Sequence, residues 1–426
     1  MKSFSFFILT LFILASCKTD KYTQKDATSD NIQIDSTALF YYIKPKHSKN
    51  APVVYFIDPH GNGKLPLKKY QKLAIENKII LVGLTNVKNN DENFLDHIGA
   101  AREMSKKVLD LSPEQKVFMT GFSGGARMAL YSDMTLKLNG ILMCGAGPGN
   151  INLQKLKSPI AIITGTKDFN FSESYYPPES NISWSQNNLI SLHFRGKHEW
   201  PPYDYFKSGL LFLFQKSDIK NIEKPEFVSF VHEINNASDI LSAYKQAELG
   251  LKTSSEEEIK KYNTKLRGFS QDKKSKQYFT QLGNVLNNEM KRNNELIKAL
   301  KEQDVDWWNN ELVELQNGMK DTSDILQSDS YYRTKALLGV VLFSNSNMAV
   351  RKPLKEDEIE KYLQIYENFE PENPDVQYLK ALHAYKNGDD YKEYLIKAKE
   401  LGYENWRQIK TDFNDSAAVA VIKTIF

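Results

Sequence analysis

Cysteine is scarce in this chain. Its 426 residues include two cysteines, Cys17 and Cys144, which excludes the framework of several disulfides that staples many small secreted domains. An excess of charge of one sign is also missing, because 56 basic residues stand against 53 acidic ones, and the sequence therefore has no electrostatic footprint for nucleic acid. The rest of the composition, 41% hydrophobic and 26% charged, is ordinary for a globular protein of two domains.

A hydrophobic run long enough to span a bilayer is missing at the N-terminus. The apolar stretch 4–14 is shorter than the roughly 20 residues that a spanning helix needs, although a transmembrane anchor is the alternative. It follows a short basic start and ends at Leu14-Ala15-Ser16-Cys17, which resembles a bacterial lipoprotein signal. We therefore expect a signal peptide over 1–16, a lipid on Cys17, a flexible tether over 17–36, and anchoring in the bacterial cell envelope at its periplasmic or cell-surface face. Cys144, in a predicted central strand, is expected to be an inert buried thiol.

A glycine-rich segment contains a candidate nucleophile. Gly121-Phe122-Ser123-Gly124-Gly125 lies between the apolar run 117–120 and a helical stretch, so a G-x-S-x-G pattern joins a strand to a helix. A serine at such a sharp turn needs backbone angles and close approaches that side chains obstruct, and the helix N-terminus then lies beneath the reacting oxygen. We predict that Ser123 is the nucleophile. An ordinary glycine turn is the alternative.

An acid and a histidine follow this serine at the ends of two later strands. Asp168 leaves the predicted buried strand 159–165, and His198 lies in the loop beyond the run 189–194. An imidazole can take the proton of a serine hydroxyl, and a carboxylate can fix its tautomer and stabilise the imidazolium. We predict Asp168 as the orienting acid and His198 as the general base. Other carboxylates near the same loops are alternatives to Asp168: Glu173, Glu199 and Asp204.

Backbone N–H groups must also face the oxygen on which negative charge develops. One donor is expected from Gly124, directly after the serine. The other normally comes from the loop after an early strand, and His60 and Gly61 follow the apolar run 52–58 in that position. A flexible surface turn is the alternative reading of this loop.

These segments together resemble a known group of enzymes. Positions 37 to 217 are similar to an α/β-hydrolase, within it to the esterases that include polyhydroxybutyrate-depolymerase-like and feruloyl-esterase-like enzymes. The resemblance rests on Pro-His-Gly at 59–61, the elbow at 121–125, Gly-Thr-Lys-Asp at 165–168 and Gly-Lys-His-Glu-Trp-Pro at 196–201. It implies a doubly wound fold, a covalent acyl-enzyme and ester hydrolysis without a metal or organic cofactor. The chain departs from the pattern in its His-Gly-Asn-Gly oxyanion segment and in lacking cysteines for the disulfides of secreted relatives.

The order of elements over 37–220 agrees with this fold class. A helix is expected at 66–77, a strand at 78–84, a helix at 93–111 and a strand at 116–120. That alternation predicts a mainly parallel sheet with helices on both faces, which binds its ligands at the carboxyl ends of the strands.

Aromatic residues near the acid and the histidine are candidates for a substrate-binding wall. Tyr175 and Trp184 lie in the long connection between the acid and the histidine, and Trp200 lies beside the histidine itself. They could equally pack these loops onto the domain, since buried aromatic rings commonly anchor packing. For Trp200 the resemblance favours a role in positioning the histidine loop.

The second half of the chain, 225–426, is predicted to be an all-α domain. Residues 355–405 are similar to a tetratricopeptide helix pair, with Gly388 at the turn, and a plain helical bundle is the alternative. Trp307 and Trp308 are expected to pack helices. The expected helices lie at 237–249, 256–267, 274–303, 307–320 and 330–344.

The sequence leaves more than one class of function open. A serine carboxylesterase acting on small molecules, glycan esters or polyesters is favoured, because a scaffold has no physical need for a nucleophile, acid, base and oxyanion loop. An interaction lipoprotein whose helices bind a protein partner is the alternative. A peptidase is also open, since the same triad cleaves amides.

Overall fold

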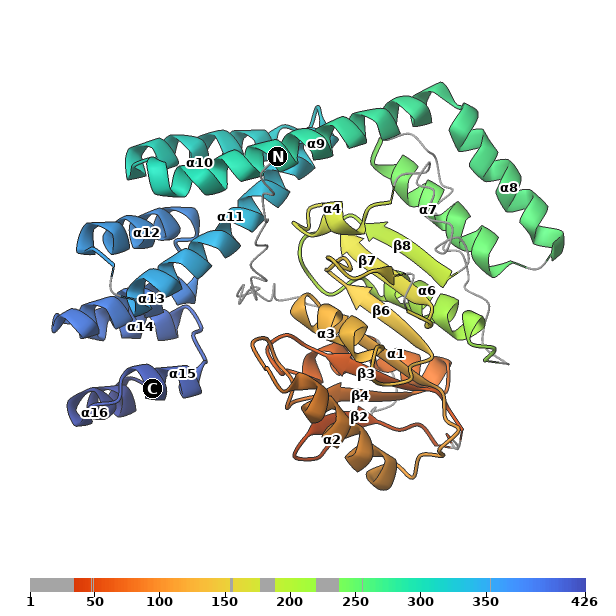
Figure 1. Cartoon of the computed structure of the whole chain (residues 1–426), viewed down its shortest axis with the longest axis horizontal. Coiled ribbons are helices and arrows are strands. Elements are labelled where there is room, and N and C mark those ends of the chain that lie inside the picture. Colours follow the sequence, from red (N-terminus) through yellow and green to blue (C-terminus); the bar gives the residue numbers. More distant parts are fainter. Residues whose placement is uncertain are drawn as a thin grey trace, which may run out of the picture. The chain divides into compact units, whose positions relative to one another are not determined.

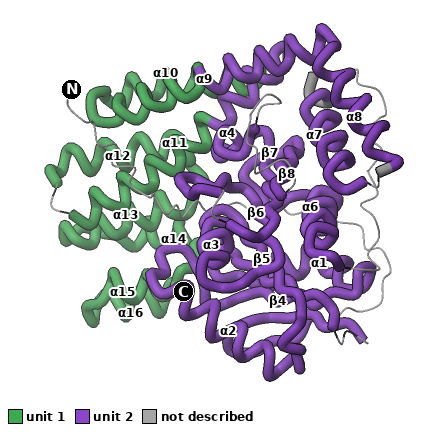
Figure 2. The backbone as a smooth tube through the Cα atoms, turned by 45° about the vertical axis from the view of Figure 1, so that its right-hand side comes forward, with its two compact units in different colours: residues 1–20, 288–322, 334–426 green, residues 21–287, 323–333 purple. Residues whose placement is uncertain are grey.

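The computed structural model describes residues 34–46, 48, 50–153, 156–176, 188–219, 237–254, 256–352 and 354–426. The chain divides into two compact units, which Figure 2 shows in different colours. The sheet unit holds the described residues up to 287 together with Ser323–Arg333. The helical unit holds Asn288–Thr322 and Thr334–Phe426. Among the described residues, no helix is both long and apolar enough to cross a membrane.

One sheet of eight strands forms the centre of the sheet unit (Figure 1). The strand order is β1-β2-β4-β3-β5-β6-β7-β8. β2 pairs antiparallel with both β1 and β4, and the neighbouring strands from β4 to β8 pair parallel. This is the α/β-hydrolase type of sheet, so the predicted fold class is confirmed. The strands are β1 Asp35–Ser36, β2 Phe40–Ile43, β3 Val53–Ile57, β4 Ile80–Leu84, β5 Val117–Phe122, β6 Gly140–Cys144, β7 Ile160–Gly165 and β8 Leu189–Phe194.

The parallel strands are mostly apolar and almost entirely buried because both faces of the sheet are covered. In β3, Val54 and Phe56 point into one core, while Val53, Tyr55 and Ile57 point into the other. The first core is covered by α1 and α6, and the second by α2 and α3. A continuous apolar run is what such a doubly covered strand requires. The helices of this part are α1 Lys64–Glu76, α2 Phe94–Val108, α3 Gly124–Ser132, α4 Phe171–Ser174 and α6 Tyr203–Lys216.

The C-terminal half is helical, as expected, but its helices belong to both units. α7 packs against β8, α6 and α8, which places the first of these helices in the sheet unit. The division between the units therefore falls within α9 and α11 and does not coincide with the expected boundary near 220–225. The helices are α7 Ala237–Thr253, α8 Glu256–Gln271, α9 Lys273–Glu302, α10 Val305–Lys320, α11 Ile325–Arg351, α12 Glu356–Phe369, α13 Pro374–Asn387, α14 Lys392–Glu400, α15 Trp406–Asp412 and α16 Ser416–Ile425.

The helical unit packs its helices through aromatic and small side chains. Trp308 is buried, and its ring lies edge-on to Phe369 with 5.7 Å between ring centroids. α13 packs against α14, and Gly388 ends α13 in a left-handed conformation with φ 80° that a side chain would disfavour. The turn at Gly388 is therefore present as predicted, while a tetratricopeptide array stays a prediction.

Candidate active site

Ser123 occupies a strained turn between β5 and α3. Its φ is 53° and its ψ is −119°, outside the regions that L-residues usually adopt, and its N–H donates to the Cys144 carbonyl at 2.8 Å. The glycines make this turn possible by close approach. A Cβ atom on Gly121 would lie 2.2 Å from the Gly125 oxygen, and one on Gly125 would lie 2.2 Å from the Ile57 oxygen. The turn therefore has the geometry of a nucleophile elbow.

Ser123, His198 and Asp168 form a continuous hydrogen-bonded relay. His198 Nε2 lies 3.0 Å from Ser123 Oγ, and His198 Nδ1 lies 3.0 Å from Asp168 Oδ1. The Asp168 side chain is fully buried, and that of His198 is 9% exposed. Asp168 Oδ1 also accepts the Asn170 N–H at 2.8 Å, which fixes the carboxylate at the end of β7. The three residues named from the sequence thus meet at the carboxyl edge of the sheet.

Two aromatic rings lie against the His198 imidazole. The ring centroids of Phe122 and Phe169 lie 4.6 Å and 4.4 Å from that of His198. Such contacts restrict the imidazole to orientations in which Nε2 can reach the serine. Phe122 precedes the nucleophile and Phe169 follows the acid, so the loops that supply the relay also fix its central member.

The alternative acids have other contacts in the described structure. Glu173 Oε2 pairs with Arg127 Nη2 at 3.0 Å, and Glu199 Oε1 accepts the Lys197 N–H at 3.2 Å. Asp204 lies in the first turn of α6. Among these carboxylates, Asp168 is the one that the structure brings to His198 Nδ1.

The predicted oxyanion donors differ in their surroundings. Gly124 begins α3, so its N–H lies at the helix N-terminus beside Ser123. The backbone N–H of His60 donates instead to Asp58 Oδ1 at 3.0 Å, and that of Gly61 to the Asp58 carbonyl at 3.0 Å. Both N–H groups therefore have an acceptor on Asp58, and the role of His60 or Gly61 as the second oxyanion donor stays a prediction. Asp58, directly after β3, turns both N–H groups toward itself.

The aromatic residues expected to line a substrate wall lie differently. Trp200 is 6% exposed, and its ring packs among core aromatics that include Phe56 and Tyr70. Tyr175 stacks on Phe171 with 5.7 Å between ring centroids, and burial raises the pKa of its phenol. Both residues therefore pack loops onto the sheet unit, which was the alternative expectation. Trp184 lies outside the described residues, as do Cys17, the signal peptide 1–16 and most of the tether.

Two contacts near the site had no counterpart among the sequence predictions. Asp58 Oδ2 accepts the Trp200 indole N–H at 3.3 Å. Arg333, from α11, donates to the Thr166 carbonyl at 2.6 Å, two residues before Asp168. Asp58 had a recognisable signal, a carboxylate at the end of a buried parallel strand, which is the same signal that identified Asp168. For Arg333 the sequence contained none.

Cys144 is fully buried in β6, and burial raises the pKa of its thiol. Within the described ranges, no group of three or more His, Cys, Asp or Glu side chains is arranged to hold a metal ion.

Comparison with known proteins identifies distant structural neighbours. No protein-family model matches the sequence, and no curated protein matches it. An acylaminoacyl peptidase from Pyrococcus horikoshii is similar at 14% identity and TM-score 0.30. The match covers 44% of this chain and 39% of the peptidase. A candidate esterase from Staphylococcus aureus is similar at 10% identity and TM-score 0.33, with 45% of this chain and 85% of that one covered. A serine hydrolase without a lid from Xanthomonas campestris is similar at 15% identity and TM-score 0.28, with 42% and 86% covered.

Proposed function

We propose that the sheet unit is a serine hydrolase of carboxylic esters, with Ser123 as nucleophile, His198 as general base and Asp168 as orienting acid. The observation that carries the proposal is the relay of two 3.0 Å contacts ending on a serine at a strained elbow. A serine hydroxyl is a weak nucleophile until a positioned imidazole takes its proton, and this arrangement supplies that imidazole.

The reaction proceeds through an acyl-enzyme. Ser123 Oγ attacks the ester carbonyl while its proton passes to His198 Nε2, and the N–H of Gly124 stabilises the resulting oxyanion. The C–O bond to the alcohol then breaks, and His198 returns the proton to the departing oxygen. Water, deprotonated by His198, attacks the acyl-enzyme. The bond to Ser123 Oγ then breaks to release the acid, and His198 returns the proton to Ser123 Oγ. Asp168 keeps the Nδ1 proton of His198 in place throughout.

The resemblance to polyhydroxybutyrate-depolymerase-like and feruloyl-esterase-like enzymes supports an ester as the substrate. The segments at 59–61, 121–125, 165–168 and 196–201 keep the order of that group. Small-molecule esters, glycan esters and polyesters are the candidates. Peptidase activity is the competing proposal, because the same relay cleaves amides.

Location at the envelope is a separate part of the proposal. The segment before Cys17 supports a lipidated N-terminus, with the hydrolase anchored to a bacterial membrane. Metabolic labelling with an alkynyl fatty acid tests it: the wild-type protein should carry the label and Cys17→Ser should not. Labelling that survives the substitution refutes the anchor.

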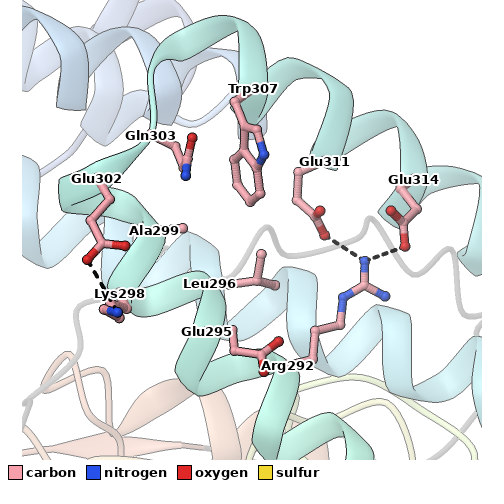
Figure 3. A pocket seen from close by; sticks show the side chains of 10 residues that line it. All are labelled: Arg292, Glu295, Leu296, Lys298, Ala299, Glu302, Gln303, Trp307, Glu311 and Glu314. Atoms are coloured by element: carbon pink, nitrogen blue, oxygen red, sulfur yellow. Dashed lines mark hydrogen bonds and ion pairs between the residues drawn. The ribbon is translucent and has the colours of Figure 1, made fainter.

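A pocket on the helical unit favours a binding role as the second candidate function. It has a volume of about 570 Å³ and lies between α9 and α10, where Trp307 faces it together with charged side chains (Figure 3). Arg292 crosses it to pair with Glu311 at 2.6 Å and Glu314 at 2.8 Å. In this reading the helices bind a protein partner. Trp307→Ala should then reduce the amount of that partner that co-purifies with the protein, without changing ester turnover.

Turnover separates the ester and peptide proposals. We would compare p-nitrophenyl acetate and p-nitrophenyl butyrate with the p-nitroanilide of an acylated amino acid, using the wild-type protein, Ser123→Ala and Ser132→Ala. Ser132 is a buried α3 serine that donates to the Met128 carbonyl, so it is a matched control. The proposal requires ester turnover that Ser123→Ala abolishes and Ser132→Ala keeps. Turnover of the anilide alone would favour a peptidase.

A further inference from the structure

Asp58 is a buried carboxylate that accepts hydrogen bonds from two separate segments of the site. It follows β3 directly, and its side chain is 3% exposed. Oδ1 accepts the backbone N–H of His60 at 3.0 Å and that of Asn62 at 3.4 Å. Oδ2 accepts the indole N–H of Trp200 at 3.3 Å. Every one of these partners is a donor, so the site suits a group that only accepts.

The segments joined in this way flank the relay. The loop after β3 lies beside the nucleophile elbow, because β3 pairs with β5 in a register that sets Ile57 opposite Gly121. Trp200 lies two residues beyond His198. Asp58 therefore connects the loop expected to face the oxyanion with the loop that carries the general base.

The histidine loop is held from a second direction by α1. Lys69 Nζ donates to the Trp200 carbonyl and Tyr70 OH to the Pro201 carbonyl, each at 2.7 Å. Burial lowers the pKa of the Lys69 ammonium. These bonds fix the backbone after His198, whereas Asp58 fixes the direction of the Trp200 ring. The ring in turn packs on Phe122, with 5.5 Å between centroids, and Phe122 contacts the His198 imidazole.

We propose that Asp58 is a positioning residue for the hydrolase reaction, holding the loop after β3 and the Trp200 ring in the single arrangement that aligns His198 with Ser123. This inference rests on the proposed function, because it assigns a role in that same site. Asp58 acts through its partners and takes no part in bond making or breaking.

The chemistry of the carboxylate makes the role testable. In Asp58→Asn one oxygen becomes an NH₂ group, which must face either Trp200 Nε1–H or the N–H groups of His60 and Asn62. A buried donor facing a donor is costly, and one of the two segments will move away. In a Trp200→Phe background the NH₂ can turn to the vacated side without a clash. The effect of Asp58→Asn should therefore depend on whether Trp200 is present.

The experiment is a double-mutant cycle on the full chain. We would measure the maximal rate and half-saturating concentration of fluorophosphonate labelling for wild type, Asp58→Asn, Trp200→Phe and the double variant. Asp58→Asn should lower the maximal rate by on the order of tenfold or more, since small misplacements of reacting groups have large effects. In the Trp200→Phe background the same substitution should lower it by a clearly smaller factor. The half-saturating concentration should change little in either background.

A matched control separates this coupling from general loss of stability. Asp133 is the C-cap of α3, at the end of that helix opposite to Ser123, and it accepts a hydrogen bond from the Ser158 hydroxyl at 2.6 Å. Asp133→Asn should therefore label at the wild-type rate. The indole ¹H–¹⁵N resonance of Trp200, identified by its loss in Trp200→Phe, should shift in Asp58→Asn.

The outcomes are distinguishable from failure of the proposed function. Wild-type protein that does not label refutes the hydrolase proposal itself, and the role of Asp58 with it. Wild-type protein that labels, with Asp58→Asn equal to it or equally slowed in both backgrounds, overturns only the role of Asp58. If Asp58→Asn alone does not fold, we expect the double variant to fold and label. In that case Trp200→Phe alone should also label more slowly than wild type. Failure of either result overturns the inference.

Discussion

Replacement of Arg333 by methionine should weaken the attachment of the loop that carries Asp168, although the two residues are far apart in the sequence. The Arg333 side chain is buried and belongs to the sheet unit through the first part of α11. It donates to the Thr166 carbonyl at 2.6 Å, and its guanidinium lies 5.1 Å from the centroid of the Phe171 ring. Next to it, Lys167 Nζ lies 3.9 Å from the Tyr332 ring centroid. The segment that presents Asp168 is thus held by α11.

The contacts set the size of the expected effect. A hydrogen bond from a charged donor contributes about 1.5–3 kcal/mol, and a desolvated cation–π contact adds on the order of 1–2 kcal/mol. Methionine restores part of this through apolar packing. We therefore expect Arg333→Met to lower the free energy of opening of the sheet unit by about 2 kcal/mol.

The buried thiol of Cys144 is a reporter for that opening. In Cys17→Ser, Cys144 is the sole cysteine, and it lies fully buried in β6. A thiol reagent reaches it when the sheet opens, and in the regime of fast reclosing the labelling rate follows the equilibrium of opening. A loss of 2 kcal/mol corresponds to labelling that is roughly thirtyfold faster. Lys298→Met is the control, because the Lys298 side chain on α9 is 75% exposed. This variant should label at the parent rate.

Two results would refute this reasoning about Arg333. Thiol labelling of Arg333→Met at the parent rate would mean that α11 does not stabilise the sheet unit. Faster labelling combined with unchanged ester turnover would mean that the bond to Thr166 has no bearing on the acid.

Other predictions follow from single contacts. Burial lowers the pKa of His193 well below its ordinary value of 6.5, so the folded protein binds fewer protons than the unfolded chain, and the free energy of unfolding should fall as the pH drops below 6.5. His193→Gln should flatten that dependence in urea titrations at pH 5 to 8, and an unchanged slope would exclude His193 as its source. Gly125→Ala should remove fluorophosphonate labelling, because its Cβ would lie 2.2 Å from the Ile57 oxygen; wild-type labelling would show that the elbow tolerates a side chain.

The features predicted correctly from sequence are those with a local signal. β3 and β7 are buried at every position and are mostly apolar because both faces of the sheet are covered, and such runs are recognisable in isolation. The meeting of Ser123, His198 and Asp168 could be predicted because each of them follows a strand, and the carboxyl ends of parallel strands meet at one edge; their catalytic roles stay a prediction. The helical character of the second half was likewise visible in its composition.

The features that were missed depend on contacts distant in sequence. His60 and Gly61 have the expected position, but the direction of their N–H groups is decided by the Asp58 carboxylate, which no spacing rule specifies. For Trp200 the sequence left a substrate wall and loop packing both open, and the contacts of its ring with Phe56 and Tyr70, distant in sequence, decide for packing. The composition changes near 225, whereas α7 and α8 still pack with the sheet unit, because the division into units follows packing and not residue type.

The central claim is that Ser123 is an activated nucleophile, and a fluorophosphonate probe tests it most directly. The purified protein, Ser123→Ala and His198→Ala would each be exposed to the probe, and any adduct located by intact and peptide mass spectrometry. We predict one adduct on the peptide that contains Ser123, absent from both variants. Folded wild-type protein without an adduct, or an adduct on another residue that survives Ser123→Ala, would contradict the claim.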